Sequence, residues 1–203
     1  MAFQPTLSKF GVPVAPGQSG LGIIMPKLKY KFRVTMQNFG PVGNAVDITR
    51  NVVTAGRPTI NHNSTPLHSY NNIMYIPHKP EWNSINITLR DDINNSATTL
   101  VQTQLQKQMN HFDQTSELAG INFKFTTILE TLDGGNTRVL ENWYLEGCYL
   151  EQVNFEQFDY QSSDAMMIEL TVRYDNATTD GGDSGAQTMP QTVTATGSGS
   201  TVG

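Results

Sequence analysis

Alternating apolar positions mark the most strand-like part of the chain. Residues 141–176 consist of two strand-like runs joined by a polar bend. In the second run a large apolar side chain stands at every second position: Met166, Ile168, Leu170, Val172 and Tyr174. This period of two is typical of a strand with one buried face. The first run, residues 143–155, is rich in aromatic and β-branched residues and is interrupted at Gly147, where a kink or bulge can turn the strand. The pattern predicts a closing hairpin.

The clearest alternation lies at residues 27–36. One predicted face carries Leu28, Tyr30, Phe32, Val34 and Met36. The other carries a basic row, Lys27, Lys29, Lys31 and Arg33. We interpret this row as a solvated face or as cross-strand partners for carboxylates such as Glu169. The alternative is a charged contact surface for a partner protein.

Further patterns complete a mainly β fold. Strands are predicted at residues 46–54, at 121–129, and at 82–90, where Ile85, Ile87 and Leu89 share a face. Residues 94–112 change to helical spacing, with the apolar positions Leu100, Val101, Leu105, Met109 and Phe112. Asn94, Asn95 or Ser96 can cap this helix, and its stripe should cover one face of the sheet. We therefore expect an antiparallel β-sandwich or barrel-like subunit with one flanking α-helix.

Composition divides the chain into an arm, a domain and a tail. Residues 1–26 are rich in Pro and Gly but contain apolar residues, so we expect an arm packed on its own domain or on a neighbouring subunit. The β-domain is expected at residues 27–176. Residues 177–203 have the composition of a disordered tail. Within this tail, residues 191–196 can add as a strand to an exposed sheet edge.

A polar, turn-rich stretch at residues 61–72 predicts a long exposed loop before a short apolar run. Long loops in compact domains usually carry function or contact a partner. The candidate contact residues are Asn61, His62, Asn63, Ser64, Thr65, His68 and Tyr70.

Charge and cysteine content narrow the classes of function. A formal charge of −5 and a pI near 5.3 argue against a protein that grips nucleic acid, because such proteins need excess Lys and Arg. The single cysteine, Cys148, excludes an internal disulfide and is expected to be a small buried residue. No apolar run approaches the roughly 20 residues of a membrane helix, so no membrane insertion is expected. The opening residues lack the pattern of a signal peptide, which favours a cytoplasmic chain.

Candidate chemistry is sparse. The four histidines show no metal-binding spacing, and no nucleophile, phosphate or dinucleotide motif occurs, so we expect no catalytic site, no metal and no cofactor. Asp91 and Asp92 are read as a connection between strand and helix and not as an acid pair for proton transfer. Aromatic residues near the C-terminal strands can stack on bases or sugars, but we favour core and subunit contacts: Trp143, Tyr144, Tyr149, Phe155, Phe158 and Tyr160.

The order of these elements resembles the tail tube protein of contractile-tailed bacteriophages. Four motifs carry the resemblance across about residues 27–176: YKFRV at 30–34, WNSINITLRDD at 82–92, LEG at 145–147 and IELTVRY at 168–174. Their order and spacing are more specific than any one of them.

The resemblance implies a structural virion protein that forms a β-barrel tube on oligomerisation. Homohexameric rings would stack inside a contractile sheath, and double-stranded DNA would pass through the tube without specific binding during genome ejection. Implied partners are the tail sheath, baseplate and tail terminator proteins, and the implied location is the virion tail after assembly in the host cytoplasm. Candidate inner-barrel or core residues are Tyr30, Phe32, Val34, Ile168, Leu170 and Val172. The loop at residues 61–72 is the candidate contact between stacked rings. At −5 per chain, a ring of six would carry a formal charge of −30, which could repel DNA from the wall if enough of it faces the lumen.

Two alternatives stay open. A tube subunit of a related contractile-injection or secretion system would share this assembly but not the genome cargo. A carbohydrate-binding β-sandwich module would instead use the aromatic residues as a binding platform.

Overall fold

The computed structural model describes residues 26–41, 45–116, 123–133 and 139–180. The chain divides into two compact units, Met1–Tyr30 and Lys31–Gly203. The described part of the first unit, residues 26–30, contains no helix or strand. The helices and strands of the described chain therefore all belong to the second unit.

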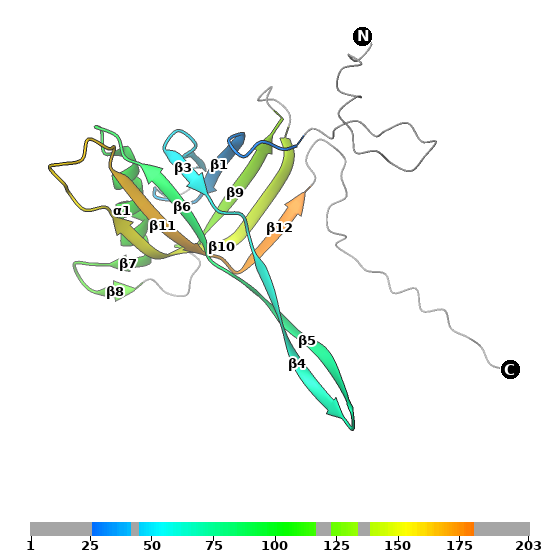
Figure 1. Cartoon of the computed structure of the whole chain (residues 1–203). Coiled ribbons are helices and arrows are strands. Elements are labelled where there is room, and N and C mark those ends of the chain that lie inside the picture. Colours follow the sequence, from blue (N-terminus) through cyan, green and yellow to red (C-terminus); the bar gives the residue numbers. More distant parts are fainter. Residues whose placement is uncertain (1–25, 42–44, 117–122, 134–138, 181–203) are drawn as a thin grey trace, which may run out of the picture. The chain divides into compact units, whose positions relative to one another are not determined.

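The second unit is built on an antiparallel sheet that folds over along its longest strand, β10 (Val139–Phe155), into two layers (Figure 1). The N-terminal half of β10 belongs to the first layer and its C-terminal half to the second. The other strands of the first layer are β2 (Ala45–Asp47), β1 (Phe32–Gln37), β9 (Phe125–Leu132) and β12 (Asn176–Asp180). Those of the second layer are β11 (Met167–Arg173), β6 (Ile85–Arg90) and β3 (Val52–Ala55).

The fold-over is located at Gly147, where the sequence predicted a kink. Gly147 has φ +68°, a region that favours glycine, and the pairing register of β10 shifts between Leu145 and Cys148. Its neighbour across the bend is Asp175, between β11 and β12, whose N–H donates to the Glu146 carbonyl at 3.0 Å. The two paired segments, β10 and the segment from β11 to β12, therefore bend at the same level of the sheet.

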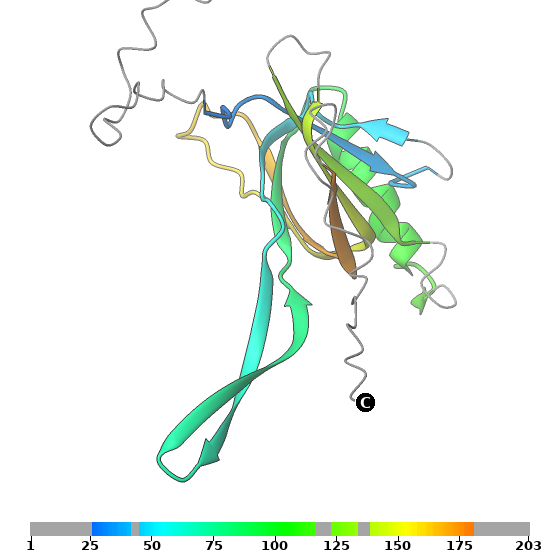
Figure 2. The same ribbon diagram turned by 90° about the vertical axis from the view of Figure 1, so that its right-hand side faces the viewer.

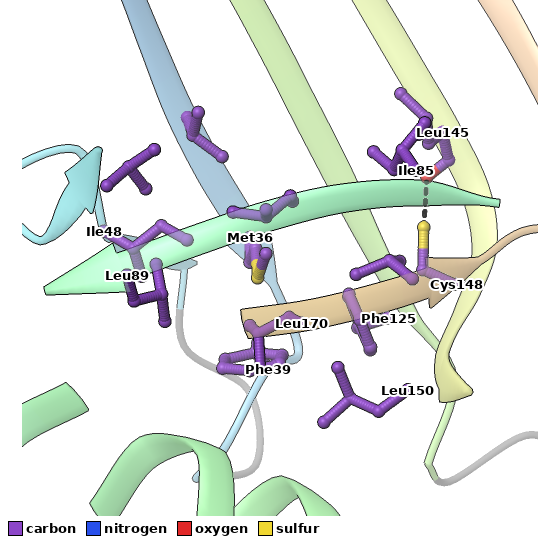
Figure 3. Packing of buried hydrophobic residues seen from close by; sticks show 14 of the residues in the cluster. Met36, Phe39, Ile48, Ile85, Leu89, Phe125, Leu145, Cys148, Leu150 and Leu170 are labelled. Atoms are coloured by element: carbon purple, nitrogen blue, oxygen red, sulfur yellow. Dashed lines mark hydrogen bonds between the residues drawn. The ribbon is translucent and has the colours of Figure 1, made fainter. Parts of the chain in front are cut away.

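The core lies between the two layers. Val34 and Met36 from β1 are fully buried, as are Ile87 from β6 and Leu170 from β11. Figure 3 shows Leu145 and Cys148 of β10 within this cluster, with the thiol donating to the Leu145 carbonyl at 3.3 Å. The predicted inward positions are confirmed at Ile85, Ile87 and Leu89 and at Ile168, Leu170, Val172 and Tyr174, all of them buried. Met166 is exposed, because β11 begins one residue later.

Helix α1 (Ser96–Gln108) is joined to the sandwich by hydrogen bonds from its polar side chains. Gln104 is fully buried: its Oε1 accepts from the Gly40 N–H at 3.0 Å and its Nε2 donates to the Phe123 carbonyl at 2.7 Å. Lys107 Nζ donates to the Asn38 carbonyl at 3.0 Å. The helix was predicted as an amphipathic element, but its buried residues are Ala97, Val101 and Gln104, with Leu100 and Leu105 only partly buried.

The predicted helix was too long at its C-terminal end. Met109 begins a short strand, β7 (Met109–Asn110), which pairs with β8 (Thr115–Ser116), and Phe112 between them is 92% exposed. The side chains of Met109 and Phe112 therefore do not extend the apolar stripe of α1.

Several predicted strand boundaries were also wrong. The strand predicted at 82–90 begins at Ile85, and the strand predicted at 121–129 is β9, Phe125–Leu132. The first strand begins at Phe32 and not at residue 27, because residues 29–30 form a turn. The strand predicted at 46–54 is two strands, β2 and β3, separated by a turn in which the Asn51 N–H donates to the Ile48 carbonyl. At the expected junction of β-domain and tail, β12 runs from Asn176 to Asp180 and pairs with β10.

The basic row of the first strand finds a different acidic partner from the one expected. Because β1 pairs with β9, Arg33 lies opposite Glu130 and forms an ion pair with it. Glu169 lies on β11 in the second layer, where it accepts from Asn154 at 3.3 Å. Residues 1–25 of the predicted arm and residues 181–203 of the predicted tail, including 191–196, lie outside the described residues.

Candidate assembly surface

The stretch predicted as a loop is one strand of a long β-hairpin. β4 (Ile60–Ser69) pairs with β5 (Asn72–Trp82) around a turn at Tyr70 and Asn71, and every residue from 60 to 81 is exposed. Figures 1 and 2 show this two-stranded ribbon leaving one end of the second layer. The prediction of exposure was right and the prediction of an irregular loop was wrong.

Both faces of the hairpin carry apolar side chains. Directly paired residues share a face, so Leu67 and Met74 lie on one side, and the next pair, Pro66 and Tyr75, lies on the other. The large apolar residues exposed along the ribbon are Ile60, Leu67, Tyr70, Ile73, Met74, Tyr75 and Ile76. A two-stranded ribbon without a covered face is only marginally stable in water. The hairpin is therefore a surface that favours burial against a partner.

The base of the hairpin is fixed to the end of the second layer. Arg173 of β11 donates to Glu81 Oε1 at 3.1 Å. Trp82 packs against Tyr174 with ring centroids 5.9 Å apart, and burial raises the pKa of Tyr174. The Asn83 N–H donates to the Thr59 carbonyl at 3.0 Å. These contacts hold the two strands at their root and leave the rest of the ribbon without support from the sandwich.

The candidate contact residues named from the sequence all belong to this hairpin. Asn61, His62, Asn63, Ser64, Thr65 and His68 lie on β4, and Tyr70 is in the turn with φ 49°. Asn61 donates to Asn83 at 3.2 Å, and Thr65 hydrogen-bonds His78 across the hairpin. Sequence reasoning missed the apolar partners on β5, Ile73, Met74, Tyr75 and Ile76, although the short apolar run at 73–76 was visible.

The candidate inner-barrel or core residues divide into two groups. Val34, Ile168, Leu170 and Val172 are buried between the layers, and Phe32 packs partly buried against them. Tyr30 precedes β1 and is 73% exposed. The four buried side chains point inward, so the residues available to any lumen are their neighbours on the opposite side of the same strands.

That opposite side of the second layer is polar. Thr54 donates to Thr88 at 2.9 Å and Thr171 to Asn86 at 3.3 Å, each across neighbouring strands. Glu169 and Asn154 continue the row on β11 and β10. We call this set, Thr54, Asn86, Thr88, Asn154, Glu169 and Thr171, the polar face.

One edge of the second layer is partly covered by a side chain. The amide of Gln108, at the end of α1, accepts from the Leu150 N–H at 2.8 Å and donates to the Leu150 carbonyl at 3.0 Å. It therefore pairs with β10 as a neighbouring strand would. Among the described residues, β10 beyond this point pairs only with β11, and at the other end of the layer β3 pairs only with β6.

Asp91 and Asp92 hydrogen-bond to the start of α1. Asp92 accepts from the Ser96 hydroxyl at 2.5 Å and from the Ser96 N–H at 2.8 Å, and these two bonds lower the pKa of its carboxyl. Asp91 accepts from the Thr98 hydroxyl at 2.5 Å. Both carboxylates therefore satisfy groups in the first turn of α1, while Asn95 at the cap position has φ 54° and makes no side-chain cap bond.

No centre for metal chemistry emerges from the described residues. Within residues 26–41, 45–116, 123–133 and 139–180, no group of three or more His, Cys, Asp or Glu side chains is placed to hold a metal ion. Cys148 is buried, and desolvation raises its thiol pKa to about 11. The same ranges contain no helix with the length and apolarity to cross a membrane.

The aromatic candidates near the C-terminal strands do not form one platform. Trp143 is partly buried against the core and donates to Glu141 at 2.6 Å. Phe155, Phe158 and Tyr160 are exposed at the end of β10 and in the loop that follows it.

No protein-family model and no curated protein sequence matches the chain. Solved structures do match in fold. A chain from the cryo-EM structure of the anti-feeding prophage cap, a tube terminating cap, matches with a TM-score of 0.58 and 17% identity over 83% of this chain and 99% of that chain. A chain from the sheath-tube complex of the extracellular contractile injection system PVC matches with a TM-score of 0.56 and 18% identity, over 77% and 92%. The SPP1 tail tube matches with a TM-score of 0.52 and 10% identity, over 77% and 80%.

These similarities confirm the fold expected from the sequence. The described residues are mainly β, with antiparallel strands and one flanking helix, and the chain shares this fold with proteins of tail tubes and contractile injection systems.

Proposed function

We propose that this chain is the repeating subunit of the tube of a contractile tail or contractile injection particle. The observation that carries the proposal is the shared fold, which extends over 99% of the chain from the anti-feeding prophage cap. A shared fold does not fix a function, so support must also come from this chain's own surface. That support is a hairpin with apolar residues on both faces, all exposed in the isolated subunit.

Ring formation would use the two edges of the second layer. β3 and the C-terminal half of β10 lie at opposite edges, and each has backbone groups available for another strand. Pairing β3 of one copy with β10 of the next would join six second layers into a closed barrel, which removes the edges. The amide of Gln108 would set where this pairing begins, because it already occupies Leu150.

The polar face would then line the lumen. Its residues are mainly Thr and Asn, and the charged side chains on the outward side of β6 and β11 include Arg90 and Arg173 as well as Glu169. Such a wall is close to neutral, so the surplus negative charge of the chain would lie elsewhere. A polar wall with mixed charges offers DNA or protein cargo no strong binding site, which suits passage through the tube.

The cargo is the finer part of the proposal. A phage tail tube inside a contractile sheath would conduct double-stranded DNA at ejection, whereas the tube of an injection particle would carry another load. Proteins from both kinds of particle share the fold. In either case the partners would be further copies of this chain, a sheath, a baseplate and a terminator, and the location would be the particle's tail.

The test is negative-stain electron microscopy of the purified chain over a concentration series. We expect rings of uniform width at low concentration and hollow tubes at high concentration. The matched variant replaces residues 62–80 with Asn-Gly, which joins the paired residues Asn61 and Glu81 through a two-residue turn. It should give rings without tubes. Monomers at every concentration for the unaltered chain, including with a baseplate extract as nucleus, would contradict the proposed function.

A further inference from the structure

The loop between β10 and β11, residues 156–166, is a second surface that no described residue covers. Every residue from 156 to 166 is exposed, and Phe158 and Tyr160 are 87% and 110% exposed. The loop contains the acids Glu156, Asp159 and Asp164 and no Lys, Arg or His. We call it the acidic loop. It presents aromatic rings within a negative field.

The hairpin has the complementary composition. Residues 60–80 contain no Asp or Glu, and with His counted as neutral their one charged side chain at pH 7 is Lys79. Its exposed apolar side chains and the aromatic rings of the acidic loop can bury each other on contact. Opposite charge around an apolar centre is the usual arrangement of a specific protein interface.

The two surfaces lie at opposite ends of the second layer, so they cannot meet within one chain. Met167, next to the acidic loop, pairs with Arg90, whereas Val172 pairs with Ile85 at the end where the hairpin leaves. Figures 1 and 2 both show the hairpin running away from the end that carries the 156–166 loop. Strands of this length separate the two ends by roughly 20 Å, since each residue advances about 3.3 Å.

We propose that the hairpin of one copy docks on the acidic loop of a second copy of this chain, which rests on the proposed function as a tube subunit. The apolar residues of the ribbon cover Phe158 and Tyr160, and Lys79 lies near the loop carboxylates. Each copy then offers a hairpin at one end and an acidic loop at the other. Such a contact is heterologous, and because its two surfaces lie at opposite ends of the second layer, it would repeat along the strand direction and extend a stack.

The direct test is disulfide trapping between two differently labelled copies. The native chain has only Cys148, which is buried and need not be replaced. One copy carries Met74→Cys in the hairpin and the other carries Phe158→Cys in the acidic loop, and both native residues are exposed. Mixed under mild oxidation, they should give the mixed disulfide dimer as the main product. The matched control pairs Met74→Cys with Phe112→Cys, which is 92% exposed but lies beyond α1.

The relative yields of the disulfide dimers show whether the hairpin contacts the acidic loop or another surface. Equal trapping with Phe112→Cys, or hairpin-to-hairpin dimers as the main product, would overturn the proposal. Trapping reads the contact in any assembly, including a dimer, so it remains decisive even if the unaltered chain forms no tubes and the proposed function fails.

A charge reversal separates ring stacking from ring formation. Asp159→Lys with Asp164→Lys changes the loop charge from −3 to +1 and leaves Glu156, which accepts from the Met167 N–H at 3.1 Å and shapes the base of the loop. We expect rings to persist and the concentration needed for tubes to rise about tenfold or more, since like charges now meet. Asp159→Asn with Asp164→Asn should give a smaller rise. Tubes at the unaltered concentration with the Lys variant would contradict the pairing.

Discussion

Gly147 and Asp175 face each other across the bend of the sheet at a separation that admits no side chain. A Cβ added to Gly147 would lie 2.2 Å from Asp175 Oδ2 and 2.7 Å from its Cγ. Gly147 also has φ +68°. The position thus needs glycine both for its backbone conformation and for its space.

We expect Gly147→Ala to lower the free energy of unfolding by about 2–4 kcal/mol, through left-handed strain and overlap. Urea unfolding followed by tryptophan fluorescence measures this. Combining it with Asp175→Ala should recover part of the loss, because the carboxylate is removed while the strain remains. No recovery in the double variant, relative to Asp175→Ala alone, would show that overlap with the carboxylate contributes nothing.

The buried amide of Gln104 gives a second prediction. Gln104→Leu removes the partners of the Gly40 N–H and the Phe123 carbonyl, and two unsatisfied backbone groups should cost about 2–4 kcal/mol of stability. Gln102→Leu, at an exposed position of the same helix, is the matched control and should change stability by under about 0.5 kcal/mol. Equal thermal shifts for the two variants would refute the role of Gln104.

The stabilisation that Asp92 gives to the first turn of α1 should be lost at acidic pH. Because the pKa of Asp92 is lowered below its ordinary value of 3.8, its stabilising effect is present above that value and is lost as the pH falls through the folded-state pKa. Asp92→Asn should therefore be less stable than the native chain near neutral pH, and the difference should shrink below about pH 3.8. Gln102→Leu, which changes an exposed residue of the same helix and no ionisable group, should show no such pH-dependent difference.

The Cys148 thiol should make the fold sensitive to base. Its pKa is raised from 9.0 to about 11, so folding favours the neutral thiol, and this contribution is complete below pH 9 and is lost as the pH rises through 11. A shift of this size corresponds to about 2–3 kcal/mol at high pH. The free energy of unfolding, measured between pH 8 and 10.5, should fall more for the native chain than for Cys148→Ala. A thiol reagent that modifies the native protein rapidly at pH 8 would contradict the burial on which this depends.

The sequence predicted those elements whose one buried face imposes a period of two. Residues 85–89 and 168–174 are examples, because each second side chain enters the core. It failed at residues 60–69, because neither face of β4 is buried and its Asn, Ser and Pro residues have turn chemistry. There the strand conformation comes from pairing with β5. The signal that could have identified the hairpin is the two-residue connection at Tyr70 and Asn71 between stretches of similar length.

The helix shows a second limit of the pattern. The polarity of Gln104 predicts a solvent-facing side chain. It is instead fully buried and hydrogen-bonded to Gly40 and Phe123. Its partners lie 64 and 19 residues away in the chain, so local spacing contains no trace of them. For the assembly surface, the sequence indicated the position of the hairpin but not its apolar faces or the acidic loop at the far end.

The hairpin between Ile60 and Glu81 contributes no residue to the hydrophobic core of the described domain. On the proposed pairing, folding and recognition are encoded in separate parts of the same polypeptide. Mutations in the ribbon can accumulate without threatening the stability of the sandwich, and so a lineage could alter which copies recognise one another while retaining its scaffold. On the proposed pairing, two such proteins present in one cell would stay distinct through matched ribbons and acidic loops, and exchanging the ribbons would exchange their partners.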